Sequence, residues 1–344
     1  MKKERVVYFD LLNIVACIAV VFLHSNVMVF DYTPGKNWAL GLGIEVLFYW
    51  AVPIFLMLSG ANLLKYRERY DTATFFKKRV AKTFIPFILW SIILYILRYA
   101  IEKGELSSSF GISEFFALFF SNNIESVYWF FFPLFALYMA MPALSLLANN
   151  RKVLLYLALT AFVLQSCIPD ICALFHLPWN PSIQQPMVTT FVFFAIIGYL
   201  CSTHSFSKQE KRIIYALGLL ALVFRYAYTF IASSQANMLD TTFFRDYGSF
   251  VGVLPSIAIF VYFKTKKWPD LIQSNAKLLA KISGCSFGVY LVHQLVLRDF
   301  LFCIVHVPMN SILLRTIGPI VIWLVCVLFV LLIKKIPLLN KIVP

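Results

Sequence analysis

The chain has 344 residues, of which 61% are hydrophobic and only 13% are charged. Soluble domains contain roughly 45–50% apolar residues, so this composition excludes an ordinary soluble protein and indicates a helical membrane protein. The formal net charge of +14 would suggest a nucleic-acid partner in a soluble protein. Here the basic residues fall in alternate loops between apolar segments, as the positive-inside rule requires, so we expect no nucleic-acid partner.

Apolar segments along the chain predict an all-α, polytopic fold with about ten transmembrane helices. The segments are residues 6–30, 40–64, 83–101, 128–148, 153–169, 187–201, 212–232, 247–263, 284–304 and 311–333. The first segment is too long for a cleaved signal peptide, and further spans follow it. Because no loop is long enough for a soluble domain, we expect one membrane domain over residues 1–344.

The distribution of basic residues predicts how the spans are oriented. With a cytoplasmic N-terminus, the inner segments contain 23 of the 30 Lys and Arg residues. The outer segments contain only Lys36, Lys103 and Arg245. This asymmetry predicts that the N- and C-termini are both cytoplasmic.

The first apolar segment carries Asp10, Asn13 and His24 within one continuous helical pattern. Polar groups at membrane depth cost free energy unless they are paired or face a cavity. Asn13 and His24 are eleven residues apart, so they lie on nearly the same helix face, about three turns from each other. We therefore expect both to face the interior of the bundle, with Asn13 lining a passage and His24 as the candidate reactive group.

The second segment contains one carboxylate, Glu45. His24 and Glu45 are each predicted to lie roughly 9 Å below the outer face, so they could meet if their helix faces do. A carboxylate beside an imidazole orients the ring and raises its basicity, which makes Glu45 a second catalytic candidate. The alternative is that Glu45 pairs with an arginine such as Arg98.

Basic residues gather where the third segment begins, at Lys77, Lys78, Arg79 and Lys82. Such a cluster is typical of an ordinary cytoplasmic anchor, or of contact with anionic membrane lipids. It could also hold the phosphates of a cytosolic anionic donor, because several convergent Lys and Arg are needed for that role.

The ninth segment carries three hydrogen-bonding residues on one helix face. Ser286, Tyr290 and His293 follow each other at i, i+4 and i+7, which predicts a polar wall along a passage. For His293 the alternative is a packed histidine whose hydrogen bonds are satisfied within the core. Arg298 and Asp299 predict an ion pair near the outer end. No loop gathers His and carboxylate ligands at a metal-binding spacing, so we expect no metal.

Six pieces of the chain, in order, resemble the acyltransferase-3 family of integral membrane acyltransferases. They are YFDLLNIVACIAVVFLH (8–24), VPIFLMLSGANLL (52–64), FFKKRVAKTFIPFILWS (75–91), YWFFFPLFALYMAMPAL (128–144), FFAIIGYLCS (193–202) and ISGCSFGVYLVH (282–293). The resemblance implies transfer of an acetyl or succinyl group from cytosolic acyl-CoA to a hydroxyl of a cell-envelope or exported glycan. The expected acceptor is therefore a carbohydrate, free or lipid-linked, and the expected location is a bacterial inner or plasma membrane.

The resemblance also assigns roles to single residues. The essential histidine of the family corresponds to His24. Its paired arginines at the start of the third span correspond to Arg79 and Lys82, and the lysine keeps the charge but loses the bidentate fork. Asn13 stands where the family often has an arginine, so the role of that arginine is in doubt in this chain.

These observations lead to one hypothesis and one rival. In the hypothesis Lys78, Arg79 and Lys82 hold the nucleotide of acetyl-CoA or another acyl-CoA, while His24 acts as general base or briefly carries the acyl group. The rival is a non-enzymatic transporter or flippase of lipid-linked sugars. It would also place polar groups in spans, but it would not consume acyl-CoA.

Overall fold

The computed structural model describes residues 6–101, 110–337 and 339–343. The described residues form helices and no strand, with 76% helix, so the all-α prediction is confirmed. Lys103, which entered the charge count, lies outside the described residues together with residues 1–5.

The described residues form α-helices joined by shorter 3-10 and π-helical turns. The α-helices are α1 Val7–His24, α2 Lys36–Phe48, α3 Ala51–Leu63, α4 Thr72–Arg79, α5 Ile85–Tyr95, α6 Ile112–Phe120, α7 Phe131–Leu147, α8 Arg151–Phe162, α9 Ile168–Leu174, α10 Thr190–Thr203, α11 Lys208–Ala236, α12 Phe250–Thr265, α13 Asp270–Ser274, α14 Ala276–Ser283, α15 Ser286–Gln294, α16 Ile312–Thr316 and α17 Gly318–Ile333. The 3-10 turns are η1 Val27–Phe30, η2 Tyr66–Glu68, η5 Ser126–Phe130 and η8 Leu339–Lys341, and the π-helical turns are η3 Val80–Phe84, η4 Ile96–Ile101, η6 Val163–Cys167 and η7 Leu295–Ile304.

Each of the ten predicted segments falls on helix. Among the described residues, seven helical stretches are long and apolar enough to cross a membrane. The remaining three segments correspond to the shorter apolar helices α10, α12 and α17. The chain is therefore a multi-pass membrane protein, while the number of ten crossings and the cytoplasmic termini stay predictions.

Several of the predicted segments are not regular helices, and prolines account for the breaks in the second and third. The second divides into α2 and α3 around Tyr49 and Trp50, because Pro53 has no N–H to bond the carbonyl of Tyr49 one turn earlier. The third passes through the π-helical turn η3 just before Pro86, where the helix again lacks an N–H donor. Asp71 caps α4, the helix that precedes this segment, by accepting the backbone N–H of Thr74 at 2.7 Å.

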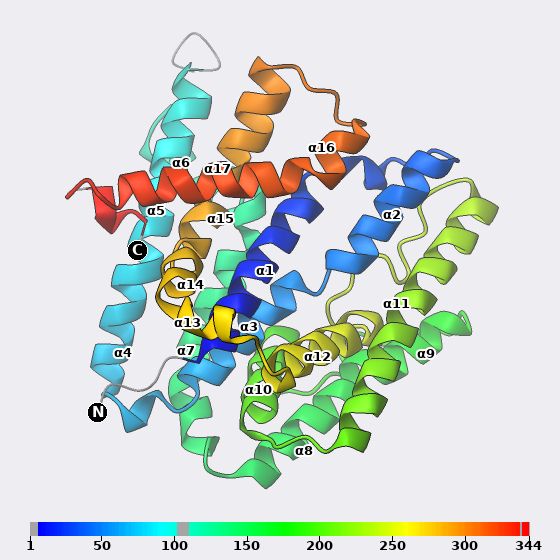
Figure 1. Cartoon of the computed structure of the whole chain (residues 1–344). Coiled ribbons are helices and arrows are strands. Elements are labelled where there is room, and N and C mark those ends of the chain that lie inside the picture. The colour runs from blue at the N-terminus through cyan, green and yellow to red at the C-terminus, as the bar shows by residue number, and fades with distance from the viewer. Residues whose placement is uncertain (1–5, 102–109, 338, 344) are drawn as a thin grey trace.

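The core of the bundle is built on α1, α3 and α10, which Figure 1 shows in the middle of the molecule. Helices α3 and α10 touch backbone to backbone at Gly60 and Gly198. A β-carbon on Gly60 would lie 1.9 Å from the carbonyl oxygen of Ala195, and one on Gly198 would lie 2.1 Å from that of Met57. Only glycine permits this approach, as is common where membrane helices pack closely.

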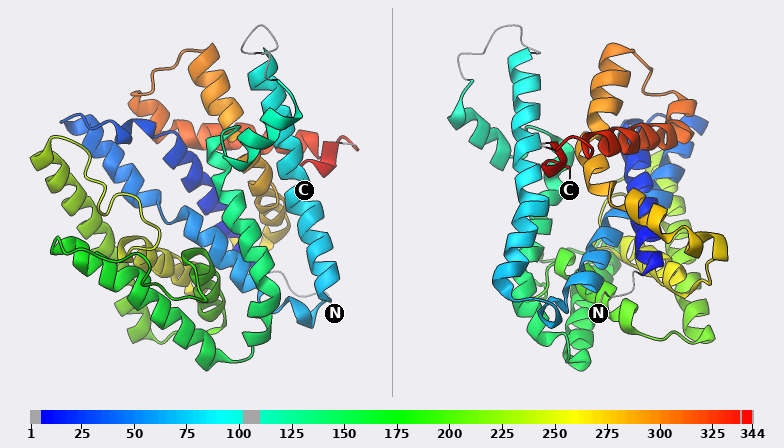
Figure 2. Two further views of the ribbon diagram at one scale, coloured as in Figure 1. Left: turned by 180° about the vertical axis from the view of Figure 1, so that it is seen from behind. Right: turned by 60° about the vertical axis from the view of Figure 1, so that its left-hand side comes forward.

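Helices α4 and α5 form a column at one edge of the bundle, as Figure 2 shows. The column joins the rest through contacts of α4 with α7 and of α5 with α6. Helix α1 contacts α14, α15 and α17 in addition to α3. This arrangement lets residues from the start of the column and residues of α1 line a common space.

Candidate active site

Two cavities follow one another along α1. The first, which we call the basic cavity, has a volume of about 780 Å³, and its polar lining includes Asn13, Asn62, Arg69, Arg79, Lys82 and Ser286. The second, which we call the histidine cavity, has a volume of about 870 Å³, and its polar lining includes His24, Glu125, Arg245, Tyr247 and Arg298. Among the described residues, Tyr290 alone lines both cavities.

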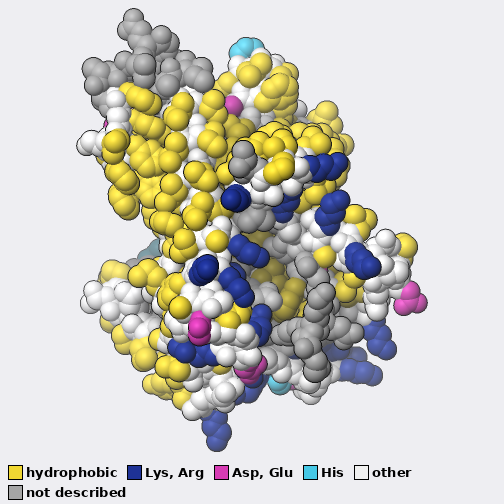
Figure 3. Space-filling model, turned by 90° about the vertical axis from the view of Figure 1, so that its left-hand side faces the viewer, with side chains coloured by type: hydrophobic (Ala, Val, Ile, Leu, Met, Phe, Trp, Pro, Cys, Tyr) yellow, Lys and Arg dark blue, Asp and Glu magenta, His cyan; other side chains and the backbone are white. Residues whose placement is uncertain are grey.

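The basic cavity brings together two of the three predicted donor-binding residues. Arg79 and Lys82 line it, and they are joined by Arg69, which the sequence analysis did not single out. The Nε atom of Arg79 is buried and makes no hydrogen bond within the described residues. Lys78 lies outside the lining, since its Nζ atom rests 3.9 Å from the ring centroid of Tyr70. Figure 3 shows the face on which Lys and Arg gather around a hollow, beside a broad hydrophobic surface.

Asn13 lines the basic cavity and also joins two parts of the chain. Its Nδ2 atom lies 2.9 Å from the carbonyl oxygen of Ser283, 2.9 Å from the Oγ atom of Ser283 and 3.0 Å from the Oγ atom of Ser286. The amide therefore fastens α1 to the junction of α14 and α15. Ser286 lines the same cavity, as its position on the face of α15 predicted.

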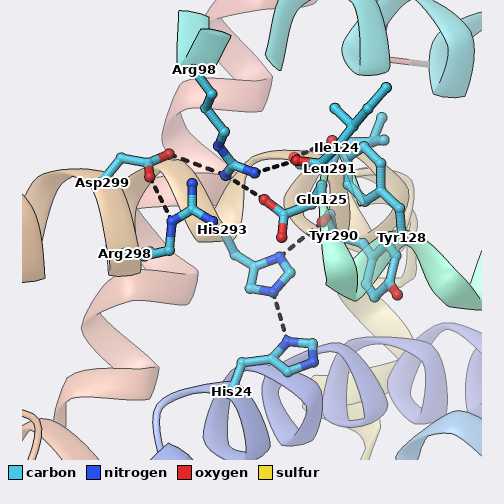
Figure 4. A network of polar contacts seen from close by, with 10 residues as sticks. All are labelled: His24, Arg98, Ile124, Glu125, Tyr128, Tyr290, Leu291, His293, Arg298 and Asp299. Atoms are coloured by element: carbon cyan, nitrogen blue, oxygen red, sulfur yellow. Dashed lines mark hydrogen bonds and ion pairs between the residues drawn. The ribbon is translucent and has the colours of Figure 1, made fainter. Parts of the chain in front are cut away.

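His24 ends α1 and faces a second histidine. Its Nδ1 atom lies 2.7 Å from Nε2 of His293, and Nδ1 of His293 lies 2.8 Å from the carbonyl oxygen of Tyr290 (Figure 4). His293 has no exposed surface and does not line either cavity, so it is a packed, hydrogen-bonded histidine rather than a lining residue. His24 is only partly buried and lines the histidine cavity.

A charged network closes one side of this site (Figure 4). Arg98 donates to the carbonyl oxygen of Ile124 at 2.7 Å, to the carboxylate of Glu125, and to Oδ2 of Asp299 at 3.4 Å. Arg298 donates from Nε to Oδ1 of Asp299 at 2.8 Å, which confirms the predicted ion pair. The network ties η4 to η5 and η7, so its role in the fold is structural.

The predicted pairing of Glu45 with His24 is wrong, whereas the alternative of an arginine partner is confirmed, with Arg245 in place of Arg98. Glu45 contacts neither His24 nor Arg98; its Oε1 atom accepts a hydrogen bond from Nε of Arg245 at 3.1 Å. Its Oε2 atom is buried and has no hydrogen-bond partner among the described residues. The expected depth of Glu45 does not specify the rotation of α2 about its axis, and that rotation determines which side chain Glu45 contacts.

The loop between α11 and α12 supplies residues that the sequence analysis missed. Arg225, on α11, is almost fully buried and donates to the carbonyl oxygens of Phe243, at 3.1 Å from Nε, and Phe244. These bonds hold the loop so that Arg245 and Tyr247 line the histidine cavity beside His24. The one available signal was that Arg225 needs partners in an apolar span, but nothing in the sequence named the two carbonyls.

A family model described as an acyltransferase domain matches residues 6–334, nearly the whole chain. This chain belongs to the acyltransferase-3 family. Comparison with curated proteins and with solved structures gave no match. Family membership and the apolar helices together indicate a membrane acyltransferase.

In this acyltransferase the geometry offers two chemical capacities. The basic cavity presents guanidinium and ammonium groups that can bind an anion. The histidine cavity presents an imidazole whose second nitrogen is free of hydrogen bonds within the described residues, and such a group can act as general base or nucleophile. Tyr290 marks the place where the two cavities adjoin.

Proposed function

We propose that this acyltransferase moves an acetyl or succinyl group from cytosolic acyl-CoA to a hydroxyl of a cell-envelope or exported glycan. This membrane domain would carry out the reaction in a bacterial inner or plasma membrane. The observation that supports the proposal is the adjacency of a basic cavity and a cavity with a partly buried imidazole. Asn13 and His24 mark the two cavities on α1 and lie ~16 Å apart along the helix axis.

The donor would enter the basic cavity. Arg69, Arg79 and Lys82 are placed to hold the phosphates of coenzyme A, and the unpaired Nε of Arg79 is a donor that such a ligand would satisfy. The long, thin pantetheine arm would then pass Tyr290 and bring the thioester to His24. This route keeps the large, charged nucleotide at the basic mouth.

The acceptor would enter the histidine cavity. Its lining combines aromatic side chains, including Trp129 and Tyr247, with the charged groups of Glu125 and Arg245. A mixture of apolar walls and a few polar groups is usual in sites for small organic ligands, and a sugar presents both kinds of surface. The cavity is thus suited to place a sugar hydroxyl beside the imidazole.

The transfer step would need no group besides these. His24 takes the proton of the acceptor hydroxyl as the oxygen attacks the thioester carbonyl carbon. The carbon–sulfur bond breaks, and the leaving thiolate of coenzyme A receives the proton from the imidazolium. In the alternative route the imidazole itself attacks the thioester carbonyl carbon, and the carbon–sulfur bond breaks to release the coenzyme A thiolate. The acceptor oxygen then attacks the acyl carbon, the carbon–nitrogen bond breaks, and the hydroxyl proton passes to the thiolate.

The test uses purified full-length protein in lipid nanodiscs with radiolabelled acetyl-CoA and succinyl-CoA. Wild-type protein should release coenzyme A and acylate glycan supplied from the same cell envelope. His24→Ala should abolish transfer with unchanged helix content, whereas His306→Asn, at an exposed position with positive φ that asparagine accepts, should keep it. Transfer by His24→Ala would refute the assignment of His24. Movement of a lipid-linked sugar without acyl-CoA turnover would favour the flippase.

Labelled protein without an acceptor would separate the two routes. A stable acyl group on His24, found by mass spectrometry, supports the acyl-carrier route, and its absence during normal turnover supports general-base catalysis. Surface polysaccharide from cells with and without the gene would identify the glycan through the mass of the lost acyl group.

A further inference from the structure

The hydrogen bond between His24 and His293 has a direction, and the surroundings of His293 determine it. Nδ1 of His293 lies 2.8 Å from the carbonyl oxygen of Tyr290. A carbonyl oxygen can only accept, so this nitrogen must carry the proton. The partner of the other nitrogen, Nε2, is Nδ1 of His24 at 2.7 Å.

His293 is best satisfied as a neutral ring. It has no exposed surface, and its ring contacts the backbone carbonyls of Tyr290 and Val289 and another imidazole, with no carboxylate. A charged imidazole without a counter-charge is costly at this depth. In the neutral ring one nitrogen carries a proton and the other accepts, so Nε2 of His293 is the acceptor.

The protonation of His24 then follows from its neighbour. Since Nε2 of His293 accepts, Nδ1 of His24 donates, and a neutral His24 has a bare Nε2. The two ring planes differ by only 13° and the centroids lie 4.8 Å apart, although two nitrogens approach to 2.7 Å. The two nitrogens are thus much closer than the ring centroids, so the rings meet through their nitrogen atoms with nearly parallel planes.

The bare nitrogen is also the accessible one. His24 lines the histidine cavity, and its Nε2 atom makes no hydrogen bond within the described residues. The other tautomer would put a proton on Nε2 and leave the lone pair of Nδ1 against the lone pair of His293. That tautomer could neither accept a proton from a substrate nor keep the bond between the rings.

We propose that His293 is a positioning residue that fixes His24 in the Nδ1–H tautomer, with the basic Nε2 presented to the cavity. The catalytic consequence rests on the proposed function, whereas the tautomer itself does not. His293 does not relay protons, because its own N–H ends on the carbonyl of Tyr290. The proton that His24 takes up at Nε2 must therefore leave from the same edge of the ring, inside the cavity.

The hydroxyl of Tyr290 helps to hold α15, the helix that carries His293, in place. It donates to the carbonyl oxygen of Val127, and the hydroxyl of Tyr128 donates to that of Leu291 at 2.8 Å. These two bonds join α15 to η5 at Tyr290 and Leu291. They therefore hold the part of α15 whose carbonyl, that of Tyr290, orients His293. The ring is thus held by its own helix, with no need for a carboxylate.

Nitrogen NMR of the full chain in lipid nanodiscs tests the tautomer without any activity. The chain has five histidines, so ¹⁵N-histidine labelling gives few signals, and His24→Gln identifies those of His24. Wild-type protein should show a protonated Nδ1 and a bare Nε2 for His24. A protonated Nε2 in the wild-type protein would overturn the proposal.

Variants of His293 test its consequence. His293→Leu removes the acceptor, so His24 should lose its fixed tautomer and kcat should fall roughly a hundredfold or more, with KM for acyl-CoA changed less than about threefold. His293→Gln can offer its Oε1 atom at a similar place, so it should keep the tautomer and recover at least about tenfold of that loss. His306→Asn serves as the matched control, with wild-type kinetics and unchanged His24 signals.

The outcomes separate the two proposals. If His293→Leu folds and keeps both the tautomer and kcat, the positioning role is wrong. If wild-type protein transfers no acyl group, the proposed function is wrong, while the NMR signals still decide whether His293 sets the tautomer.

Discussion

Replacing Arg245 with methionine would remove the partner of a carboxylate that has no exposed surface. Glu45 is fully buried, and its hydrogen bond from Nε of Arg245 at 3.1 Å is the one that the structure gives it. Breaking a fully buried ion pair by removing one member typically costs 3–5 kcal/mol, but the Arg245 side chain is 42% exposed, so solvent screens part of this interaction. Arg225 still interacts electrostatically with Glu45, so we expect the lower end, ~3 kcal/mol of unfolding free energy.

The reciprocal changes define the magnitude of the coupling. Glu45→Gln keeps the shape and one acceptor but loses the charge, so it should cost ~1.5 kcal/mol. The double variant leaves no unpaired carboxylate. Its loss of unfolding free energy should therefore be ~2 kcal/mol smaller than the summed losses of the two single variants. This positive coupling is the signature of a direct pair.

Equilibrium unfolding in mixed micelles, followed by the helical circular dichroism signal, measures all four proteins under one condition. A second cycle with Glu45→Gln and His24→Gln should be additive within ~0.5 kcal/mol, because these residues share no contact. Additivity of the Arg245 cycle would refute the pairing described here. Strong coupling in the His24 cycle would instead restore Glu45 as the partner of the imidazole.

Three further changes test other parts of the structure. Gly60→Val should greatly reduce the yield of folded protein in detergent, because its β-carbon would meet α10 backbone at 1.9 Å, whereas Gly43→Ala, with its nearest neighbour at 3.8 Å, should not. Arg79→Met should raise KM for acyl-CoA about tenfold with kcat within about twofold, while exposed Lys77→Met should leave both near wild type. The capping N–H lowers the pKa of Asp71, so this cap is complete above the unfolded-state pKa and is lost as pH falls through the lowered value. Amide exchange at the start of α4 should then become less protected in acid, and Asp71→Asn should remove this pH dependence.

Each of these expectations has an outcome that contradicts it. Normal yield of Gly60→Val would mean that α3 and α10 are not in backbone contact. An unchanged KM for Arg79→Met would remove its guanidinium from donor binding. Equal acid sensitivity in Asp71→Asn would show that another group titrates at the start of α4.

Much of the fold could be predicted because the bilayer imposes strong rules on sequence. Apolar length located all ten helical segments, since a spanning helix must satisfy its own backbone and expose apolar side chains to lipid. The points at which a segment divides into separate helices were harder to predict. The division of the second segment at Tyr49 depends on how Pro53 frees a carbonyl, and hydropathy does not detect that.

The candidate site shows where prediction from sequence ends. His24, Arg79 and Lys82 lie in the two cavities because each stands at a helix end or on a polar face that the pattern revealed. The partners of Glu45 and His24 required tertiary information, since helix rotation and the path of the α11–α12 loop are set by packing. The sequence did contain one signal for His293. Asn13 and His24 share a face of α1, and Ser286 and His293 share a face of α15. In the structure Asn13 bonds to Ser286, and His24 bonds to His293.

A cell membrane must keep its ion gradients while a protein of this kind turns over. In the described part of the chain the two cavities share a single lining residue, Tyr290, whose ring is held by a bond from its hydroxyl to the carbonyl of Val127. This one aromatic side chain is therefore part of the wall of both cavities. In the proposed route an acyl arm would have to pass this ring, whereas a hydrated ion would meet a mostly apolar side chain that favours dewetting. The same ring would then limit both the transfer of the acyl group and the leakage of ions. A substitution of Tyr290 that reduces ion leakage would therefore also slow the transfer.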